Sequence, residues 1–295
     1  MGRWAQFTER LRPRRPALLN IASDVGEGPV IILVHGIASS AATFKRLIPM
    51  LSDKHRCIAI DLLGFGESPA PENATYTIEE HVASIHETIK SLRLRAPFVL
   101  VGHSLGSLLS ARYAAVHPEQ VSRLVLVSPP VYLSTSEIGD PRVRRQVGAY
   151  LRVYEFMRAN KAFTMTTAAR ISQLFQLKDV LEVTERNWRP FMLSLQNCIE
   201  SQTAISDIAA VRVPIDVVYG AQDQFIAPGT ISIIEQMRHV TMHRVEVNDH
   251  LTDVWQGRQS LAYRCLPLHK FPRLATITFR DFEGEASDAE RNLTS

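Results

Sequence analysis

Five short apolar runs, separated by segments with helical spacing, constrain the fold more than any other feature of the sequence. The runs are Val30–Val34, Cys57–Ile60, Phe98–Val101, Leu124–Val127 and Ile215–Tyr219. Each is apolar at consecutive positions, as expected of a strand that is buried on both faces. Such strands, alternating with helices, predict an α/β fold with a mostly parallel, doubly wound sheet between two layers of helices.

Helical spacing is clearest in two of the segments between these runs. Apolar residues recur every three or four positions over residues 77–92, and Thr77 with Glu80 predicts a capping box at the start of that helix. A second helix is expected over Leu105–Val116 and should end near His117-Pro118. Ser104 therefore lies between a buried strand and a helix.

Residues 131–208 have a different pattern. They contain long helical stretches, such as Arg142–Asn160 and Asn187–Gln202, and the strand pattern resumes only at Val213. We interpret 131–208 as a helical cap inserted into a core that is split between residues 1–130 and 209–295. The alternative is a pair of long crossover helices of the core, but a crossover needs only about a dozen residues, so the length favours a cap.

Composition and charge reduce the number of function classes that the chain could belong to. The chain has 295 residues and a net charge of +3, but residues 1–15 hold five arginines and one glutamate, so the remainder is close to neutral. We see no basic stripe or nucleic-acid-binding motif, and expect no nucleic-acid partner. Cys57, Cys198 and Cys265 are odd in number and widely spaced, which indicates packing residues in a reducing compartment. Without an apolar stretch of signal or membrane-spanning length, we expect a cytoplasmic protein with no integral membrane segment.

The two ends of the sequence resemble tails. Residues 281–295 hold five acidic residues and one arginine, and we expect them to be disordered. Near the other end, Trp4, Phe7 and Leu11 follow helical spacing among arginines, a pattern that also suits an anionic membrane surface. A packed first turn or a frayed tail is commoner for so short a segment, so membrane contact through residues 1–15 is the weaker interpretation.

The pattern Gly102-His103-Ser104-Leu105-Gly106 has a chemical interpretation because it lies at a strand–helix junction. A serine hydroxyl is a poor nucleophile until a base removes its proton, and a third group must hold that base in the right tautomer. In a parallel sheet the loops after the strands meet along one rim. We therefore look for the partners of Ser104 in those loops.

Two strand-end loops supply candidate partners. His250 follows the alternating run Thr241–Val247, and Asp223 follows the strand Ile215–Tyr219. Candidate donors to the oxyanion are the backbone N–H of Leu105, at the start of a helix, and that of Ile37, in the loop after the first buried strand. Gly36 would permit a close approach of that loop.

These segments resemble the α/β-hydrolase fold superfamily. In order they are VIILVHGIASS, DLLGFGESP, VGHSLGS, VVYGAQDQFI and VEVNDHLTD, and the likeness spans roughly residues 16–266. The resemblance implies that Ser104 is the nucleophile, His250 the general base and Asp223 its orienting acid. It implies an oxyanion hole at Ile37 and Leu105, and a structural, buttressing role for Asp61–Ser68.

Two features depart from the pattern of that superfamily. Ser107 stands where many relatives have a third glycine, and Asn248-Asp249 precedes the histidine in place of the commoner small residue and glycine.

An aspartate nucleophile at the turn is absent from the sequence, which argues against dehalogenase or epoxide-hydrolase chemistry. We see no clustered metal ligands and no nucleotide fingerprint, so no metal ion and no cofactor is expected.

The sequence predicts a serine hydrolase that cleaves a small or medium, largely apolar carboxylic ester through an acyl-enzyme. Trp188 and Phe191 are the first candidates for an apolar, substrate-binding wall of the cap. Three alternatives remain open: a carbon–carbon bond hydrolase of vinylogous diketones, a monoacylglycerol lipase or lysophospholipase, and a ligand-binding, receptor-type protein on the same fold. An arginine or lysine in the pocket would favour the first of them.

Overall fold

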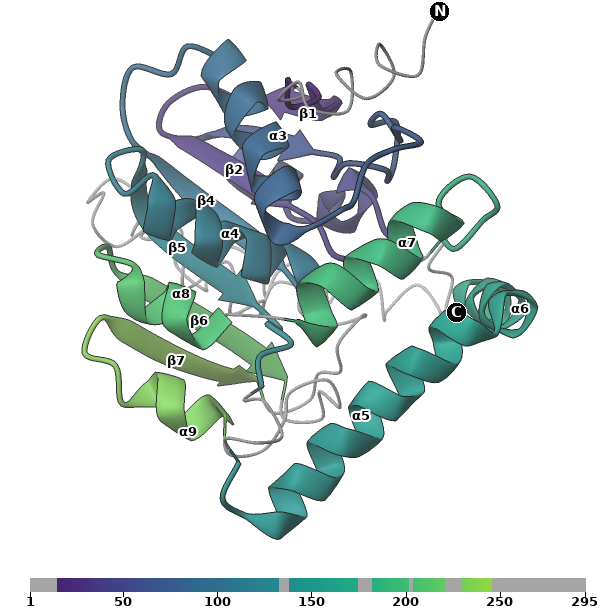
Figure 1. The fold of residues 1–295 in the computed structure, drawn as a ribbon. Helices are drawn as coiled ribbons and strands as arrows, with labels where there is room; N and C mark the ends of the chain where they lie inside the picture. Colours follow the sequence, from purple (N-terminus) through teal and green to yellow (C-terminus); the bar gives the residue numbers. More distant parts are fainter. Residues whose placement is uncertain (1–14, 133–137, 175–181, 202–203, 221–229, 246–295) are drawn as a thin grey trace, which may run out of the picture.

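The computed structural model describes residues 15–132, 138–174, 182–201, 204–220 and 230–245. Its core is a seven-stranded sheet with the order β1-β3-β2-β4-β5-β6-β7 (Figure 1). β1 pairs antiparallel with β3, and every other neighbouring pair is parallel. The predicted α/β class and the mostly parallel sheet are confirmed. The strands are β1 (Ile21–Val25), β2 (Val30–Val34), β3 (Arg56–Ile60), β4 (Phe98–His103), β5 (Val121–Val127), β6 (Ile215–Gly220) and β7 (Val240–Val245).

Strand β2 shows why the predicted runs are apolar at consecutive positions. Ile32 and Val34 belong to a large hydrophobic cluster on one face of the sheet, and Ile31 and Leu33 belong to a second cluster on the opposite face. All four side chains are at most 1% exposed. Each face must therefore be covered by another layer of the chain.

Helices form those two layers. On one face α4 (Leu105–Val116) packs between α3 (Ile78–Ser91) and α8 (Ala204–Ala210), as Figure 1 shows. On the other face the second cluster includes side chains of the 3₁₀ helix η1 (Ala41–Phe44) and of α2 (Ile48–Leu51). A further helix, α9 (Thr230–Glu235), precedes β7.

Helix α3 begins with a variant of the predicted capping box. The Thr77 hydroxyl accepts a hydrogen bond from the Glu80 N–H at 3.2 Å, as expected. The Glu80 carboxylate, however, accepts from the backbone N–H groups of Thr75 and Tyr76, at 2.7 Å each. The start of the helix is thus tied to the two residues that precede its cap.

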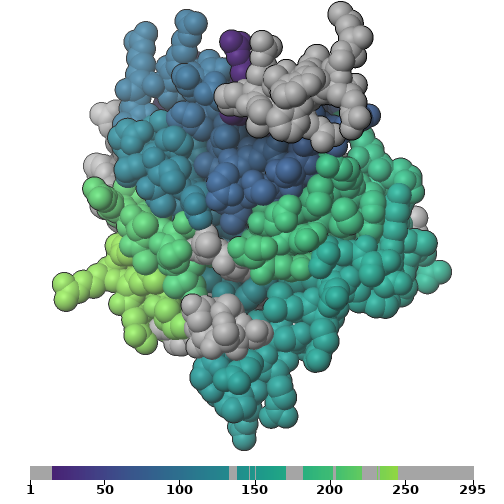
Figure 2. Space-filling model, viewed as in Figure 1, coloured from purple at the N-terminus to yellow at the C-terminus, as the bar shows by residue number. Residues whose placement is uncertain are grey.

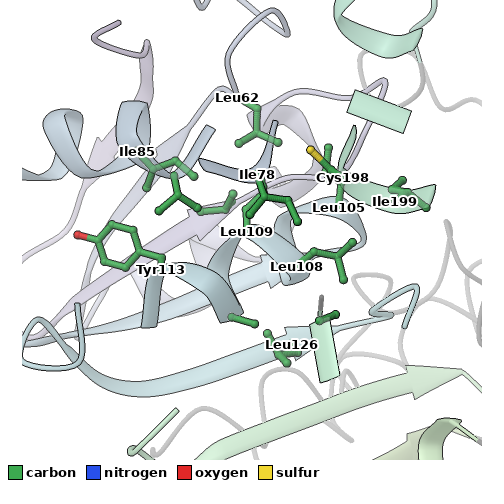
Figure 3. Packing of buried hydrophobic residues seen from close by; sticks show 14 of the residues in the cluster. Leu62, Ile78, Ile85, Leu105, Leu108, Leu109, Tyr113, Leu126, Cys198 and Ile199 are labelled. Atoms are coloured by element: carbon green, nitrogen blue, oxygen red, sulfur yellow. The ribbon is translucent and has the colours of Figure 1, made fainter. Parts of the chain in front are cut away.

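The core beneath α4 brings together residues that are far apart in sequence. Figure 3 shows Leu105, Leu108 and Leu109 of α4 beside Leu126 of β5 and Ile199 of the segment before α8. The cysteines Cys57 and Cys198 are buried, and burial raises the pKa of both thiols, that of Cys57 to about 11. Both behave as packing residues, whereas Cys265 lies outside the described residues.

Between β5 and β6 the described secondary structure is helical. It comprises α5 (Pro141–Ala159), α6 (Lys161–Leu174), α7 (Trp188–Ser194), the π-helical segment η2 (Leu195–Glu200) and α8. The single helix expected over Asn187–Gln202 is therefore divided between α7 and η2. In Figure 1 α5 and α6 extend away from the sheet, whereas α8 packs on α4 and crosses the predicted boundary at residue 208. No helix in the described ranges is both long and apolar enough to cross a bilayer.

The predicted buttressing loop, Asp61–Ser68, is organised by one carboxylate. Asp61 is 3% exposed and accepts hydrogen bonds from the Ala41 N–H at 2.8 Å, the Asn20 side-chain amide at 2.8 Å and the Glu67 N–H at 3.0 Å. These donors come from three separate segments of the chain. Asp61 therefore holds the chain before β1, the start of η1 and the loop after β3 together.

The first prediction tests this carboxylate. Asp61→Asn replaces an acceptor oxygen with an N–H₂ group that would face backbone donors, and one buried donor would lose its partner. We expect the free energy of unfolding in urea to fall by about 1–3 kcal/mol. Asp53→Asn, at an exposed position, should change it by less than about 0.5 kcal/mol. Equal stability of the two variants would contradict the assignment.

Candidate active site

Ser104 has a backbone conformation that is rare for a residue with a side chain. Its φ is 52° and its ψ is −120°, and it lies between the end of β4 and the start of α4. Its N–H donates to the Val127 carbonyl at 2.9 Å, which holds the turn against β5. A conformation of this kind persists only where the surrounding structure imposes it, and such residues cluster at active sites.

The two flanking glycines make this turn possible. A Cβ at Gly102 would lie 2.3 Å from the Gly106 carbonyl oxygen, and a Cβ at Gly106 would lie 2.2 Å from the Val34 carbonyl oxygen. Both distances are far shorter than any real Cβ contact, so neither position has room for a side chain. The Gly-x-Ser-x-Gly spacing is thus the spacing at which α4 turns back onto β4 and β2.

Ser107, which departs from the usual third glycine, also contributes to the turn. Its hydroxyl lies 2.8 Å from the Gly102 carbonyl oxygen and 3.0 Å from that of Val127, within donating distance of both. The same carbonyl of Val127 accepts the Ser104 N–H. The hydroxyl at residue 107 therefore ties the first turn of α4 to β4 and β5.

The expected oxyanion donors flank Ser104. Leu105 is the first residue of α4, where a backbone N–H has no partner within the helix. Ile37 follows β2, and a Cβ at the preceding residue, Gly36, would lie 3.0 Å from the Cβ of Ser104. No hydrogen bond joins the Ile37 N–H to another described residue. Two backbone segments with available donors thus meet at the serine.

His35, which sequence reasoning left without a role, fixes the loop that carries Ile37. Its Nε2 accepts the Leu62 N–H at 2.8 Å, so in the neutral ring Nδ1 carries the proton and donates to the Gly36 carbonyl at 2.8 Å. The ring is fully buried, and burial lowers its pKa to about 4. His35 is a neutral link between the buttressing loop and the loop beside Ser104.

An apolar cavity of about 400 Å³ opens onto Ser104, a volume within the range of small-molecule sites. None of the described residues that line it carries a charge. Phe191 is among them, but Trp188 is not. The lining residues are Gly36, Ile37, Ala38, Ser39, His103, Ser104, Pro130, Val153, Tyr154, Phe156, Met157, Phe163, Thr164, Thr167, Ala168, Val183, Phe191, Leu195 and Ile199.

Trp188 lies behind this wall. Its ring centroid is 5.7 Å from that of Phe191, and the Lys161 ammonium lies 5.9 Å from the centre of the indole. Lys161 also pairs with Glu185 at 2.5 Å. Trp188 therefore supports Phe191 from outside the described cavity.

Asp223 and His250 lie outside the described residues, but the strands that lead to them are described. β6 ends at Gly220 and β7 at Val245, and these two residues are partners in the parallel register. Both strands run parallel to β4, which leads to Ser104. The chain therefore leaves β6 and β7 along the same edge of the sheet as the serine.

Comparison with known proteins identifies the family. A profile of the alpha/beta hydrolase fold matches residues 29–251. The chain belongs to the alpha/beta hydrolase fold family. The relatives described below are named as hydrolases.

Three relatives illustrate the range within the alpha/beta hydrolase family. Lipase 1 of Psychrobacter immobilis is 26% identical over 256 residues, which cover 79% of this chain and 78% of that protein. A probable lysophospholipase of Arabidopsis thaliana is 38% identical over 107 residues, covering 35% of this chain and only 23% of that protein. A meta-cleavage product hydrolase from Pseudomonas fluorescens IP01 shares the fold, with a TM-score of 0.61 and 22% identity, covering 87% of this chain and 95% of the other.

The second prediction concerns the close approach of Gly36 to Ser104. In Gly36→Ala the new methyl would meet the Ser104 Cβ at 3.0 Å and the His103 ring at 3.3 Å, so the serine must shift by a few tenths of an ångström. We expect kcat/KM on any accepted ester to fall on the order of tenfold. Gly148→Ala, on α5 with open space around it, should leave kcat/KM unchanged. Comparable rates for both variants would refute a tight loop at Ser104.

The third prediction follows from the neutral His35. The unfolded imidazole binds a proton near pH 6.5 but the folded one only near pH 4, so stability falls as the pH drops through that window. Gln at residue 35 keeps an acceptor for the Leu62 N–H but cannot titrate. The loss of unfolding free energy between pH 7 and pH 5 should be about 1–2 kcal/mol smaller in His35→Gln than in the parent protein. Identical losses would show that His35 titrates normally.

Proposed function

We propose that the protein is a serine hydrolase that cleaves a small or medium, largely apolar carboxylic ester through an acyl-enzyme. Ser104 is the nucleophile, His250 the general base and Asp223 the acid that orients it. The observation that carries the proposal is an uncharged, apolar cavity that opens directly onto a serine held in a strained turn. Such a cavity suits an acyl chain, and the turn presents the hydroxyl to its carbonyl carbon.

The reaction proceeds in two halves. The Ser104 Oγ attacks the carbonyl carbon while His250 takes the hydroxyl proton, and the oxyanion accepts hydrogen bonds from the N–H groups of Ile37 and Leu105. His250 then gives the proton to the leaving alkoxide, and an acyl-serine remains. Water, deprotonated by His250, attacks this ester, and the serine leaves with the proton to release the carboxylic acid.

The cavity also bears on the alternatives. A vinylogous diketone that carries a carboxylate would need a cationic partner in a buried site, and the described lining contains neither arginine nor lysine. A receptor-type protein would gain nothing from a strained serine between two glycines that lack room for a side chain. Ester hydrolysis would use both the uncharged cavity and the strained serine.

We further infer that residues 131–208 act as a cap. Most of the cavity wall comes from α5, α6, α7 and η2, which face the turn at Ser104. The small-molecule ester would bind between these helices and the carboxyl edge of the sheet. A cytoplasmic location stays a prediction.

The fourth prediction tests this chemistry. Nitrophenyl esters of increasing acyl length should give a maximum of kcat/KM at one chain length, because the cavity is apolar and finite. Ser104→Ala should lower kcat by roughly 10³-fold or more at that length. Ser110→Ala removes a buried hydroxyl from α4, the helix that follows Ser104, and this variant should retain activity. Equal turnover by the parent protein and Ser104→Ala would refute Ser104 as the nucleophile, and inertness of both would refute simple ester hydrolysis.

A second pair of variants tests the role of Asp223 against that of Asp249, which precedes His250 in the sequence. Asp223→Asn should lower kcat by several powers of ten, because the base would lose its orienting carboxylate. Asp249→Asn, next to His250 in sequence, should leave most of the activity. The reverse ranking would assign the orienting role to Asp249.

A further inference from the structure

Three exposed apolar side chains gather at the mouth of the cavity. Among the described residues the exposed large hydrophobics are Leu18, Val25, Val116, Val153, Phe156 and Phe163. The last three are 53%, 49% and 56% exposed, and all three also line the cavity. The rings of Phe156 and Phe163 contact edge to face, with centroids 5.4 Å apart. The apolar wall that begins at Ser104 thus continues onto the surface between α5 and α6.

Helix α5, which contributes Val153 and Phe156 to this mouth, is strongly basic. It carries five arginines and one acidic residue, Glu155. Arg158 is paired with Glu200, and Arg144 donates to the Ile138 carbonyl, so the protein itself uses these two. The other three, Arg142, Arg145 and Arg152, are exposed; within the described residues Arg145 donates only to the Pro141 carbonyl of its own helix, at 3.3 Å.

These three arginines share one side of α5 with the apolar residues. Arg145 is seven residues before Arg152, and Arg152 is four residues before Phe156. Arg145, Arg152 and Phe156 therefore lie along one side of the helix. The described residues provide no ion pair for Arg142, Arg145 or Arg152. Figure 2 shows α5 and α6 as a teal surface along the lower and right edge of the molecule. We call Arg142, Arg145, Arg152, Val153, Phe156 and Phe163 the α5 face.

The combination of charge and apolar side chains limits the occupant. In a two-fold dimer the α5 face would meet itself, and its arginines would repel each other. An anionic phospholipid surface instead offers phosphate groups to arginines and acyl chains to phenylalanines at the depth of the headgroup boundary. Exposed apolar residues at a pocket mouth, on a helix whose exposed arginines have no ion pair among the described residues, match that surface.

We propose that the α5 face docks on an anionic phospholipid surface and brings the mouth of the cavity to the lipid. This goes beyond the hydrolytic function, because docking requires neither Ser104 nor turnover. The surface is distinct from residues 1–15. It implies that acyl esters reach the cavity from a lipid phase as well as from water.

The fifth prediction uses the full-length Ser104→Ala protein, so that hydrolysis cannot alter the lipid. In co-sedimentation it should bind vesicles of phosphatidylcholine with phosphatidylglycerol, bind phosphatidylcholine alone far less, and lose binding as salt is raised. Adding Arg145→Gln and Arg152→Gln should weaken the partition by roughly 25-fold, about fivefold for each charge. Phe156→Ser with Phe163→Ser should weaken it as well, because the apolar contact is lost.

Matched controls locate the binding surface. Arg93→Gln with Arg95→Gln makes the same charge change at exposed positions just before β4, at the opposite edge of the sheet, and should retain binding. Val116→Ser removes an exposed apolar residue at the end of α4 and should also retain binding. Equal loss in the two arginine pairs would mean nonspecific attraction and overturn the proposal.

Other outcomes would also overturn it. The proposal would fail if the protein did not bind anionic vesicles, or if only deletion of residues 1–15 abolished binding. It would also fail if light scattering showed a dimer that Phe156→Ser abolishes. In an otherwise unaltered protein with Ser104 intact, Arg145→Gln with Arg152→Gln should leave hydrolysis of a soluble short-chain ester unchanged. Ester turnover without vesicle binding would refute docking alone, and vesicle binding without turnover would refute the hydrolytic function alone.

Discussion

The positive φ of Ser104 costs on the order of 1–3 kcal/mol, and the packing of three adjacent strands holds it in place. β5 accepts the Ser104 N–H, and β2 lies so close to Gly106 that no side chain could come between them. The glycines, the apolar strands and Ser107 therefore act together.

Behind this turn, buried polar groups set the position of Ile37, whose N–H is the second oxyanion donor in the proposed reaction. Asp61 anchors the loop after β3, Leu62 in that loop donates to His35, and His35 donates to the carbonyl next to Ile37. Each group in this chain has its partner, so a neutral histidine can remain fully buried at neutral pH. The loop beside Ser104 is thereby fixed before a substrate arrives, which lowers the reorganisation needed in the transition state.

Five strands could be predicted because they are buried on both faces and their apolar runs have no other explanation, and β7 could be predicted from the alternation over Thr241–Val247. β1 was not predicted: it is an edge strand with exposed Ala22, Asp24 and Val25, and its pairing with β3 depends on contacts that no local pattern reveals. The turn at Ser104 could be predicted from the five-residue pattern Gly102-His103-Ser104-Leu105-Gly106. The cavity wall could not, since helical spacing does not tell which side of α5 or α6 faces Ser104, and Phe191 rather than Trp188 lines it.

Charge is divided between the outside and the inside of the candidate site. Arg142, Arg145 and Arg152 of α5 are exposed, whereas the described wall of the cavity contains no aspartate, glutamate, lysine or arginine. Electrostatic attraction by the arginines acts as a charged surface approaches, and in salt it falls off within about 10 Å. The cavity, by contrast, discriminates against charged ligands because burying a charge there is costly. An anionic lipid headgroup would therefore be held at the α5 face, and only its neutral acyl part would enter. The same division would keep the proposed acyl-enzyme in surroundings where the proposed oxyanion donors act most strongly.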